Sequence, residues 1–386
     1  MTDRTAVAHA AAAGLRAYGN RAERARAVVG FDGFVDSIIR VVDQREDATT
    51  YTSLATIADF GGRVSAAAGK SANFEFVTTL QKLGGNGPIM ANAMAAGEVS
   101  MTYLGSIGYP EPDPIFQELV DRSQTVIPLA EAGRTDALEF DDGKLMLGKY
   151  AHLLTLGADR IRETIGVEKM VEVLAETDLL AMINWTMMPG TQTIWELLRD
   201  EILPGLDRGG RERLMVFFDL CDPAKRTMED LQEALKVMSS LQEHADVILG
   251  MNLAEATHVV KALGLPAAPD PEAEIETTAV AVREALDTHA AVVHPRAGAA
   301  ACRVVDGAVH SAAFAGPFVK HPRLSTGAGD NFNAGFCLGL LAGLELEQCL
   351  CTGTATSGFY VRNAASPTLN ELAGFCDELP DPEAGR

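Results

Sequence analysis

The sequence lacks two features that would place the protein at a membrane or on nucleic acid. No apolar run, including residues 179–188, approaches the about 20 residues that a membrane-spanning helix needs. Basic residues are few, because 32 Lys and Arg stand against 53 Asp and Glu and give a formal net charge of −21. Nucleic acids and anionic membranes are bound by basic faces. We therefore expect neither as a partner.

Regular patterns of metal or disulfide residues are also missing. The six cysteines include no Cys-x-x-Cys pair, and the eight histidines include no His-Glu-x-x-His motif. This predicts reduced thiols in a cytoplasmic protein without structural zinc. His294, His310 and His321 are interpreted as ordinary core or surface residues.

Two common nucleotide-binding motifs are incomplete. A P-loop ending at Gly69-Lys70-Ser71 would need a glycine at position 64, where Val64 stands. A dinucleotide fingerprint starting at Gly327 would need a glycine at position 332, which is Phe332. A nucleotide would have to be bound by another kind of loop.

What the chain does contain is an alternation of short apolar strands with helices. This pattern predicts an α/β fold with a mostly parallel sheet covered on both faces. The 386 residues, 47% of them hydrophobic, suit one large domain with an appended lid. The predicted strands are Val28–Phe31, Met101–Gly105, Leu179–Trp185, Leu214–Leu220, Val247–Gly250 and Ala290–His294.

Two regions interrupt the alternation. Residues 33–82 and 125–150 contain polar, strand-forming stretches, and the second has an Asp-Gly hairpin turn at residues 142–143. We predict that both belong to a small β-rich lid, with a helix around residues 53–64, inside a single domain of residues 1–386.

The stretch from Leu324 to Phe336 is the most informative part of the chain. Gly327, Ala328 and Gly329 have little or no side chain, so their amides can face an anion at the start of the following helix. Asp330 lies in the first turn of that helix, where a carboxylate can take a proton from a hydroxyl group. The pattern favours phosphoryl transfer to an alcohol, although a simple helix start with a favourable Asp would look the same.

Three further segments carry polar groups where strands and helices meet. Gly84-Gly85-Asn86 precedes a helix of small residues, and residues 28–39 form an apolar stretch with the acids Asp32 and Asp36. Asp32 could simply cap its own turn. Asn252 and Glu255 stand three residues apart at a helix start, where a capping box is the alternative reading.

Together these segments resemble the ribokinase-like carbohydrate kinases, the phosphofructokinase-B type. The family signature Asp-Thr-x-Gly-Ala-Gly-Asp matches Thr326 to Asp330, while Leu324 replaces its first acid. Ile89 stands where the family has an Asn, and residues 294–298 replace its Thr-x-Gly-x-x-Gly motif. The resemblance covers residues 28–362 and implies a three-layer sandwich. In family members that have it, the first acid of the signature helps build a monovalent-cation site.

The resemblance also assigns roles to residues. It implies that Asp330 is the general base and that Gly327, Ala328 and Gly329 form the anion hole. The acceptor contacts that it implies are Asp36, Gly84 and Gly85, and we add Asn86 because Ile89 stands in the place of the family's Asn. At the nucleotide it implies that Asn252 and Glu255 hold magnesium through water. We add Thr326, Ala355 and Gly358 as nucleotide contacts, although helix packing alone would also favour the small residues of the last helix.

We therefore expect an ATP- and Mg²⁺-dependent kinase that acts on a sugar or sugar-like polyol. A nucleoside kinase of the same fold and a catalytically silent sugar-binding homologue remain alternatives. Whether the acceptor is already phosphorylated, and whether the chain forms a homodimer through the lid, is left open by the sequence.

Overall fold

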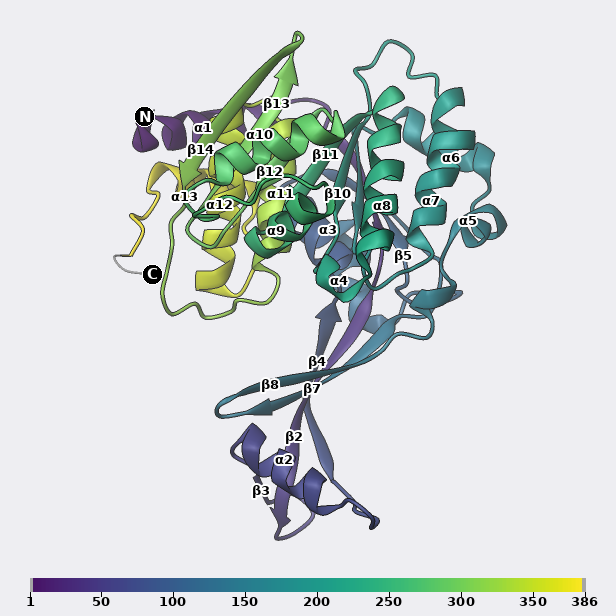
Figure 1. The fold of residues 1–386 in the computed structure, drawn as a ribbon, viewed down its shortest axis with the longest axis vertical. Coiled ribbons are helices and arrows are strands. Elements are labelled where there is room, and N and C mark those ends of the chain that lie inside the picture. Colours follow the sequence, from purple (N-terminus) through teal and green to yellow (C-terminus); the bar gives the residue numbers. More distant parts are fainter. Residues whose placement is uncertain (1–2, 384–386) are drawn as a thin grey trace.

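The computed structural model describes residues 3–383, which form a large body and a smaller lid (Figure 1). Nine strands build the sheet of the body in the order β14-β13-β12-β11-β10-β9-β1-β5-β6. The strands are β1 (Arg26–Phe31), β5 (Ser100–Gly105), β6 (Thr125–Pro128), β9 (Leu179–Ile183), β10 (Met215–Asp219), β11 (Asp246–Met251), β12 (Ala290–Val293), β13 (Gly298–Val305) and β14 (Ala308–Ala315).

The strands from β6 to β12 run parallel, and only β13 and β14 are antiparallel to their neighbours. The central strands are buried along almost their whole length, because helices cover both faces and leave no side of the sheet for water. All six strands predicted from the sequence are present, with ends that differ by at most two residues.

Two layers of helices complete the sandwich. Packed in one apolar core against one face are α1 (Arg4–Gly19), α3 (Asn86–Ala96), α4 (Gln117–Arg122), α11 (Ala328–Leu341), α12 (Leu346–Asn363) and α13 (Leu369–Asp377). The other face is covered by α5 (Ala158–Thr164), α6 (Val167–Ala175), α7 (Thr191–Leu197), α8 (Met228–Ser240), α9 (Leu253–Ala262) and α10 (Ile275–Leu286). The three-layer arrangement predicted from the sequence is confirmed.

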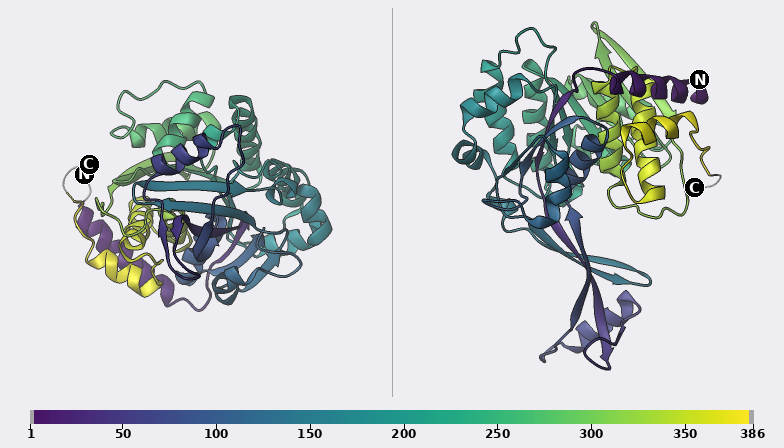
Figure 2. Two further views of the ribbon diagram at one scale, coloured as in Figure 1. Left: turned by 90° about the horizontal axis from the view of Figure 1, so that it is seen from below. Right: turned by 180° about the vertical axis from the view of Figure 1, so that it is seen from behind.

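The lid is a separate five-stranded sheet that projects from one edge of the body (Figure 2). Its strands are β2 (Phe34–Arg45), β3 (Tyr51–Ser53), β4 (Phe76–Gly84), β7 (Gly133–Phe140) and β8 (Gly143–Lys149), with helix α2 (Ile57–Ala66) beside them. The long strand β2 pairs antiparallel with β4 and parallel with β7. Strand β6, which lies within residues 125–150, pairs with β5 in the body instead.

The lid marks the edge of the sheet at which the polar residues gather. Strand β2 follows β1 after only Asp32 and Gly33, so the lid lies beyond the carboxyl ends of the parallel strands. Open α/β sheets bind their ligands at this edge. No helix within residues 3–383 is both long enough and apolar enough to cross a bilayer.

Candidate active site

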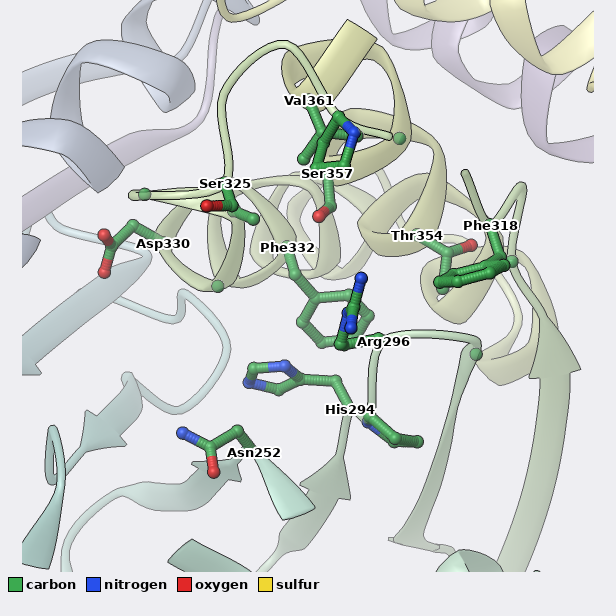
Figure 3. Close-up of a pocket in the computed structure, with 18 of the residues that line it drawn as sticks. Asn252, His294, Arg296, Phe318, Ser325, Asp330, Phe332, Thr354, Ser357 and Val361 are labelled. Atoms are coloured by element: carbon green, nitrogen blue, oxygen red, sulfur yellow. The ribbon is translucent and has the colours of Figure 1, made fainter. Parts of the chain in front are cut away.

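A cavity of about 670 Å³ opens at the carboxyl edge of the sheet, a size typical of small-molecule sites (Figure 3). The ends of β10, β11 and β12, the start of α11 and one face of α12 form its walls. Among its lining residues are Asn86, Asp219, Cys221, Asn252, Glu255, His294, Arg296, Phe318, Gly327, Ala328, Gly329 and Asp330. Residues from separate parts of the chain between Asn86 and Val361 therefore meet here, and none of them comes from the lid.

Gly327, Ala328 and Gly329 form the start of α11 and face this cavity. Gly327 caps the helix with a φ of 90°, a conformation that side chains rarely adopt, and a Cβ there would lie 2.9 Å from the Tyr360 hydroxyl. The Ala328 amide donates to the Ser325 carbonyl at 3.2 Å, whereas within residues 3–383 the amides of Gly327 and Gly329 have no acceptor. Two of the three predicted amides are thus free to bind an anion.

Asp330 stands one residue further along α11 and is 5% exposed. Its Oδ1 accepts a hydrogen bond from Asn86 Nδ2 at 2.9 Å. Burial, and next the Asp219 charge, raise the pKa of Asp330 well above its ordinary value, while the bond from Asn86 opposes that shift. The predicted base and the predicted acceptor residue are therefore in direct contact.

Three more buried acids surround Asp330. Asp219 ends β10 and accepts from Asn333 Nδ2 at 2.5 Å and from the Cys221 amide at 2.9 Å. Burial raises the pKa of Asp219 and of Asp32, the latter to about 6. Within the described chain neither these acids nor Glu255 or Asp330 has a Lys or Arg partner, so no cation balances the acids of the cluster that ionise.

Asn252 and Glu255 lie at the start of α9 and form the capping box that was the alternative reading of their spacing. Glu255 also accepts from the Asp222 amide at 2.9 Å, and burial raises its pKa to about 8. No group of three or more His, Cys, Asp or Glu side chains in residues 3–383 is arranged to ligate a metal directly. The acidic, cation-poor cluster fits a magnesium ion that keeps most of its ligands as water and phosphate oxygens.

The acceptor side lies where β2 leaves the body. Residues 28–39 are two strands, and Asp36 lies in β2 of the lid, with Lys82 of β4 and Thr135 of β7 as its register partners. A Cβ on Gly84 would lie 2.5 Å from Asp36 Oδ2, so a larger residue there would displace the Asp36 carboxylate. Gly85 has a φ of 99° and caps α3.

Asp32 does not cap its own turn, as the sequence suggested, but the start of α3. Its carboxylate accepts from the amides of Asn86 at 3.0 Å and Gly87 at 2.7 Å. Asp32 is fully buried, and so the negative charge sits at the positive end of the helix dipole. It fixes the turn that presents Asn86 to the cavity.

Two of the predicted nucleotide contacts, Ala355 and Thr326, do not line the cavity. Ala355 is fully buried in the core, and Thr326 is exposed and contributes only its carbonyl, which accepts from Tyr360. Gly358, by contrast, lines the cavity. The remaining wall of α12 consists of Thr354, Ser357 and Val361 (Figure 3).

His294 is not the ordinary core or surface residue that we expected. It lines the cavity and stacks on Phe332 with ring centroids 4.4 Å apart, and its Nε2 is buried without a partner in the described chain. Burial lowers its pKa to about 4. Arg296, the one Arg or Lys among the lining residues, lies over the Phe318 ring at 5.5 Å.

Ile89 and Leu324, the two residues that depart from the family motifs, both lie close to the α11 turn or to α12. Ile89 lies on α3, and its Cγ2 would be 3.3 Å from a Cβ on Gly327, so its side chain leaves little room for any residue but glycine there. Leu324 is partly exposed, and its amide donates to the Val361 carbonyl at 3.3 Å. It offers no carboxylate for a cation.

Sequence reasoning missed Asp219, Asn184 and Asn333, which all belong to the buried polar cluster. Asp219 and Asn184 each end or follow a predicted buried strand. A polar residue at the carboxyl end of such a strand was therefore the signal that could have identified both.

We expect the unliganded protein to lose stability as the pH rises from about 5 to about 8. The folded-state pKa values of about 6 for Asp32 and about 8 for Glu255 exceed the ordinary 3.8 and 4.5. Their contribution to stability is complete below the ordinary values and is lost as the pH rises through the raised ones. Melting temperatures measured across this range would show the decline.

Glu255→Gln is the matched control for this decline. Because Gln does not titrate, the variant should lose less stability than the wild type between about pH 6.5 and 8.5, the range in which the raised pKa of Glu255 lies. The general charge repulsion of the acidic surface is the same in both proteins. If the melting temperatures of the two proteins fell in parallel over this range, Glu255 would not be the group that binds the proton.

Comparison with known proteins gives matches over nearly the whole chain. A sequence profile described as prokaryotic ketohexokinase matches residues 2–379. A ketohexokinase of Haloferax volcanii is 28% identical over 363 residues, which cover 94% of this chain and 93% of that protein.

Solved structures with the same fold include ribokinases from Thermotoga maritima (19% identity, TM-score 0.58) and from Arabidopsis thaliana, the latter complexed with ribose and ATP (15%, 0.61). A mutant phosphofructokinase-2 from Escherichia coli is also similar (16%, 0.60). Each match covers 92% of this chain and 99% of the other.

Proposed function

Because the chain belongs to the prokaryotic ketohexokinase family of ribokinase-like carbohydrate kinases, we propose that it transfers the γ-phosphoryl group of ATP to a hydroxyl of a ketohexose. The observation that supports the chemistry most directly is the position of Asp330 beside the free amides of Gly327 and Gly329 in one cavity. A base and an anion site side by side are what phosphoryl transfer to an alcohol requires.

In this proposal the lid strand β2 and the turn before α3 bind the acceptor. Asp36, half-buried next to Gly84, accepts hydrogen bonds from sugar hydroxyls, and Asn86 borders the hydroxyl that reacts. Closing the lid over the sugar would exclude water and so limit hydrolysis of ATP. Asp330 then takes the proton of the attacking hydroxyl.

The nucleotide occupies the other half of the cavity. Thr354, Ser357, Gly358 and Val361 on α12 give a flat wall for the base, and Phe318 also lines the cavity, beside Thr354 (Figure 3). The amides of Gly327 and Gly329 bind the transferring phosphoryl group, where its negative charge builds up.

Asn252 and Glu255 lie where they can hold the waters of a magnesium ion. Such an ion would neutralise the triphosphate in a cluster that otherwise repels it. Arg296 adds a positive charge at the rim of the cavity.

The experiment that tests this function is a coupled ADP-release assay across four acceptor classes: ketohexoses, aldohexoses, hexose phosphates and nucleosides. We expect ketohexoses to be turned over with the highest kcat/KM, by about tenfold or more over aldohexoses, because a changed hydroxyl leaves buried polar groups unpaired. Reactions without acceptor correct for ATP hydrolysis, and NMR of the product identifies the phosphorylated hydroxyl. A nucleoside as the best acceptor would contradict the proposal, and no turnover with any acceptor would favour a silent homologue.

A further inference from the structure

Asn184 occupies an unusual place directly after strand β9. It is fully buried and has a φ of 67°, in the left-handed region that Asn tolerates better than most side chains. No nucleotide or sugar contact is assigned to it, since it lies behind Asn86 as seen from the cavity and does not line it. A buried amide in a strained backbone conformation calls for an explanation.

Every hydrogen-bonding group of the Asn184 side chain is used. Its Oδ1 accepts from the Met187 amide at 3.2 Å, and its Nδ2 donates to Asp32 Oδ2 at 2.8 Å and to Asn86 Oδ1 at 3.3 Å. Exchanging its oxygen and nitrogen would set two donors against each other at Met187 and two acceptors at Asp32. The orientation of the Asn184 amide is therefore fixed.

The orientation of Asn86 follows from that of Asn184. Because its Oδ1 faces the Asn184 donor, its Nδ2 must face the other way, toward Asp330 Oδ1 at 2.9 Å. The backbone of Asn86 is held as well, since its amide donates to Asp32 Oδ2 at 3.0 Å. The opposite rotamer would put the amide oxygen of Asn86 against the carboxylate of Asp330.

These contacts form an amide relay, defined here as Met187 N–H to Asn184, Asn184 to Asn86, and Asn86 to Asp330. We propose that Asn184 is a positioning residue that acts through this relay, by fixing the direction of Asn86 and thereby the direction of the Asp330 carboxylate. The proposal rests on the proposed function, in which Asp330 is the base.

The relay determines which oxygen of Asp330 can take a proton. Oδ1 is held by Asn86, while Oδ2 has no partner among the described residues. With one oxygen anchored, the carboxylate cannot rotate freely, and Oδ2 is left free to take the proton of the acceptor. Holding a reacting group in place is worth a large factor in rate, because a displacement of about 1 Å can cost 10²-fold.

The relay also supports the charged form of Asp330. The charged and titratable groups that face Asp330 are Asp219 from β10, Asp32 from the β1–β2 connection, Glu255 from α9, Cys221 after β10 and Tyr360 from α12. Three of these are acids that oppose ionisation of Asp330, and Asn86 is the donor that favours it. Loss of the relay should raise the pKa of Asp330 and move the acidic limb of the rate profile to higher pH.

The test is a double-mutant cycle with Asn184→Gly and Asn86→Ala, measured by kcat and by the pH profile. Glycine keeps the positive φ and removes only the amide. We expect N184G to lower kcat by about tenfold or more, with a smaller change in the KM for ATP, and to shift the acidic limb upward. In the N86A background N184G should change kcat less than twofold, because the relay is already broken.

Two results would overturn the proposal. If the two substitutions multiply in their effects on kcat, Asn184 does not act through Asn86. If N184G lowers only the melting temperature and leaves kcat and the pH profile as they were, Asn184 serves only to donate a hydrogen bond to the buried Asp32. Should N184G not fold, Asn184→Ser, which retains a donor for Asp32 but is too short to reach both acceptors, gives the same cycle.

A crystal structure of N184G separates this proposal from the proposed function. Asn86 Nδ2 should no longer lie within hydrogen-bonding distance of Asp330 Oδ1, whatever the role of Asp330. If Asp330→Asn keeps its turnover while this contact is lost, the assigned base is wrong and the relay stands. If Asp330→Asn is inactive while the contact persists in N184G, the relay is wrong and the base stands.

Discussion

Replacing Asp330 by Asn should reduce kcat with a ketohexose by about 10²- to 10⁴-fold, the range that a positioned base contributes. The amide has nearly the same shape and can still bond to Asn86, so the cavity and the α11 turn stay as they are. What is lost is the lone pair that takes the proton of the acceptor. Steady-state assays should show this loss in kcat, while nucleotide affinity measured by calorimetry changes little.

The same substitution should raise the melting temperature. Asp330 is buried among three other acids without a cation, so its charge costs stability that a neutral amide does not. An inactive but more stable D330N protein cannot be explained by misfolding. Asp222→Asn is the matched control, because its carboxylate lies near the same cluster but pairs with Lys225 at 3.2 Å on the surface. If D330N retained more than about a tenth of the wild-type kcat, Asp330 would not be the base.

The sequence predicted the layers of the fold because these depend on local patterns. Short apolar strands separated by amphipathic helices allow few arrangements other than a covered parallel sheet. The lid strands were predicted only as a region, because β2 pairs with β4 and β7, which are far away in the sequence. Residues 125–128 could not be separated from the lid by composition, since β6 differs from a lid strand only in its partner, β5.

The parts of the candidate site that lie within one turn were also predictable. Gly327 to Asp330 and the capping box of Asn252 and Glu255 are formed by neighbours in the chain. Asp32 was misread because its partners, the amides of Asn86 and Gly87, are more than 50 residues away. Its role depends on the packing of α3 beside β1, which no local pattern reveals.

The error at Ala355 concerns the rotation of a helix about its axis. Residues 354, 357, 358 and 361 line the cavity and follow the i, i+3, i+4, i+7 spacing of one helical face. Ala355 is turned by about 100° from that face and packs into the core. Since α12 is rich in small residues on all sides, its sequence does not show which side faces the nucleotide.

The second large effect should come from Gly329→Pro, which removes a single N–H from the anion site. Gly329 is the second residue of α11, and proline is tolerated in the first turn of a helix because those amides have no intrahelical partner. If the Gly329 amide binds the transferring phosphoryl group, its loss should lower kcat by about 10²- to 10³-fold, the cost of removing one donor from an oxyanion hole. Initial rates at saturating ATP and acceptor would measure this loss of kcat.

Gly329→Ala separates the amide from the glycine itself. A Cβ at this position would lie 3.6 Å from His294 Cε1, an ordinary contact, and the N–H remains. G329A should therefore keep most of the wild-type kcat, whereas at Gly327 even alanine would be strained by the φ of 90°. If G329A and G329P were equally impaired, the position would matter for space and not for its hydrogen. A large loss in G329P alone would mean that phosphoryl transfer relies on the free N–H that Ala328, bonded to Ser325, does not offer.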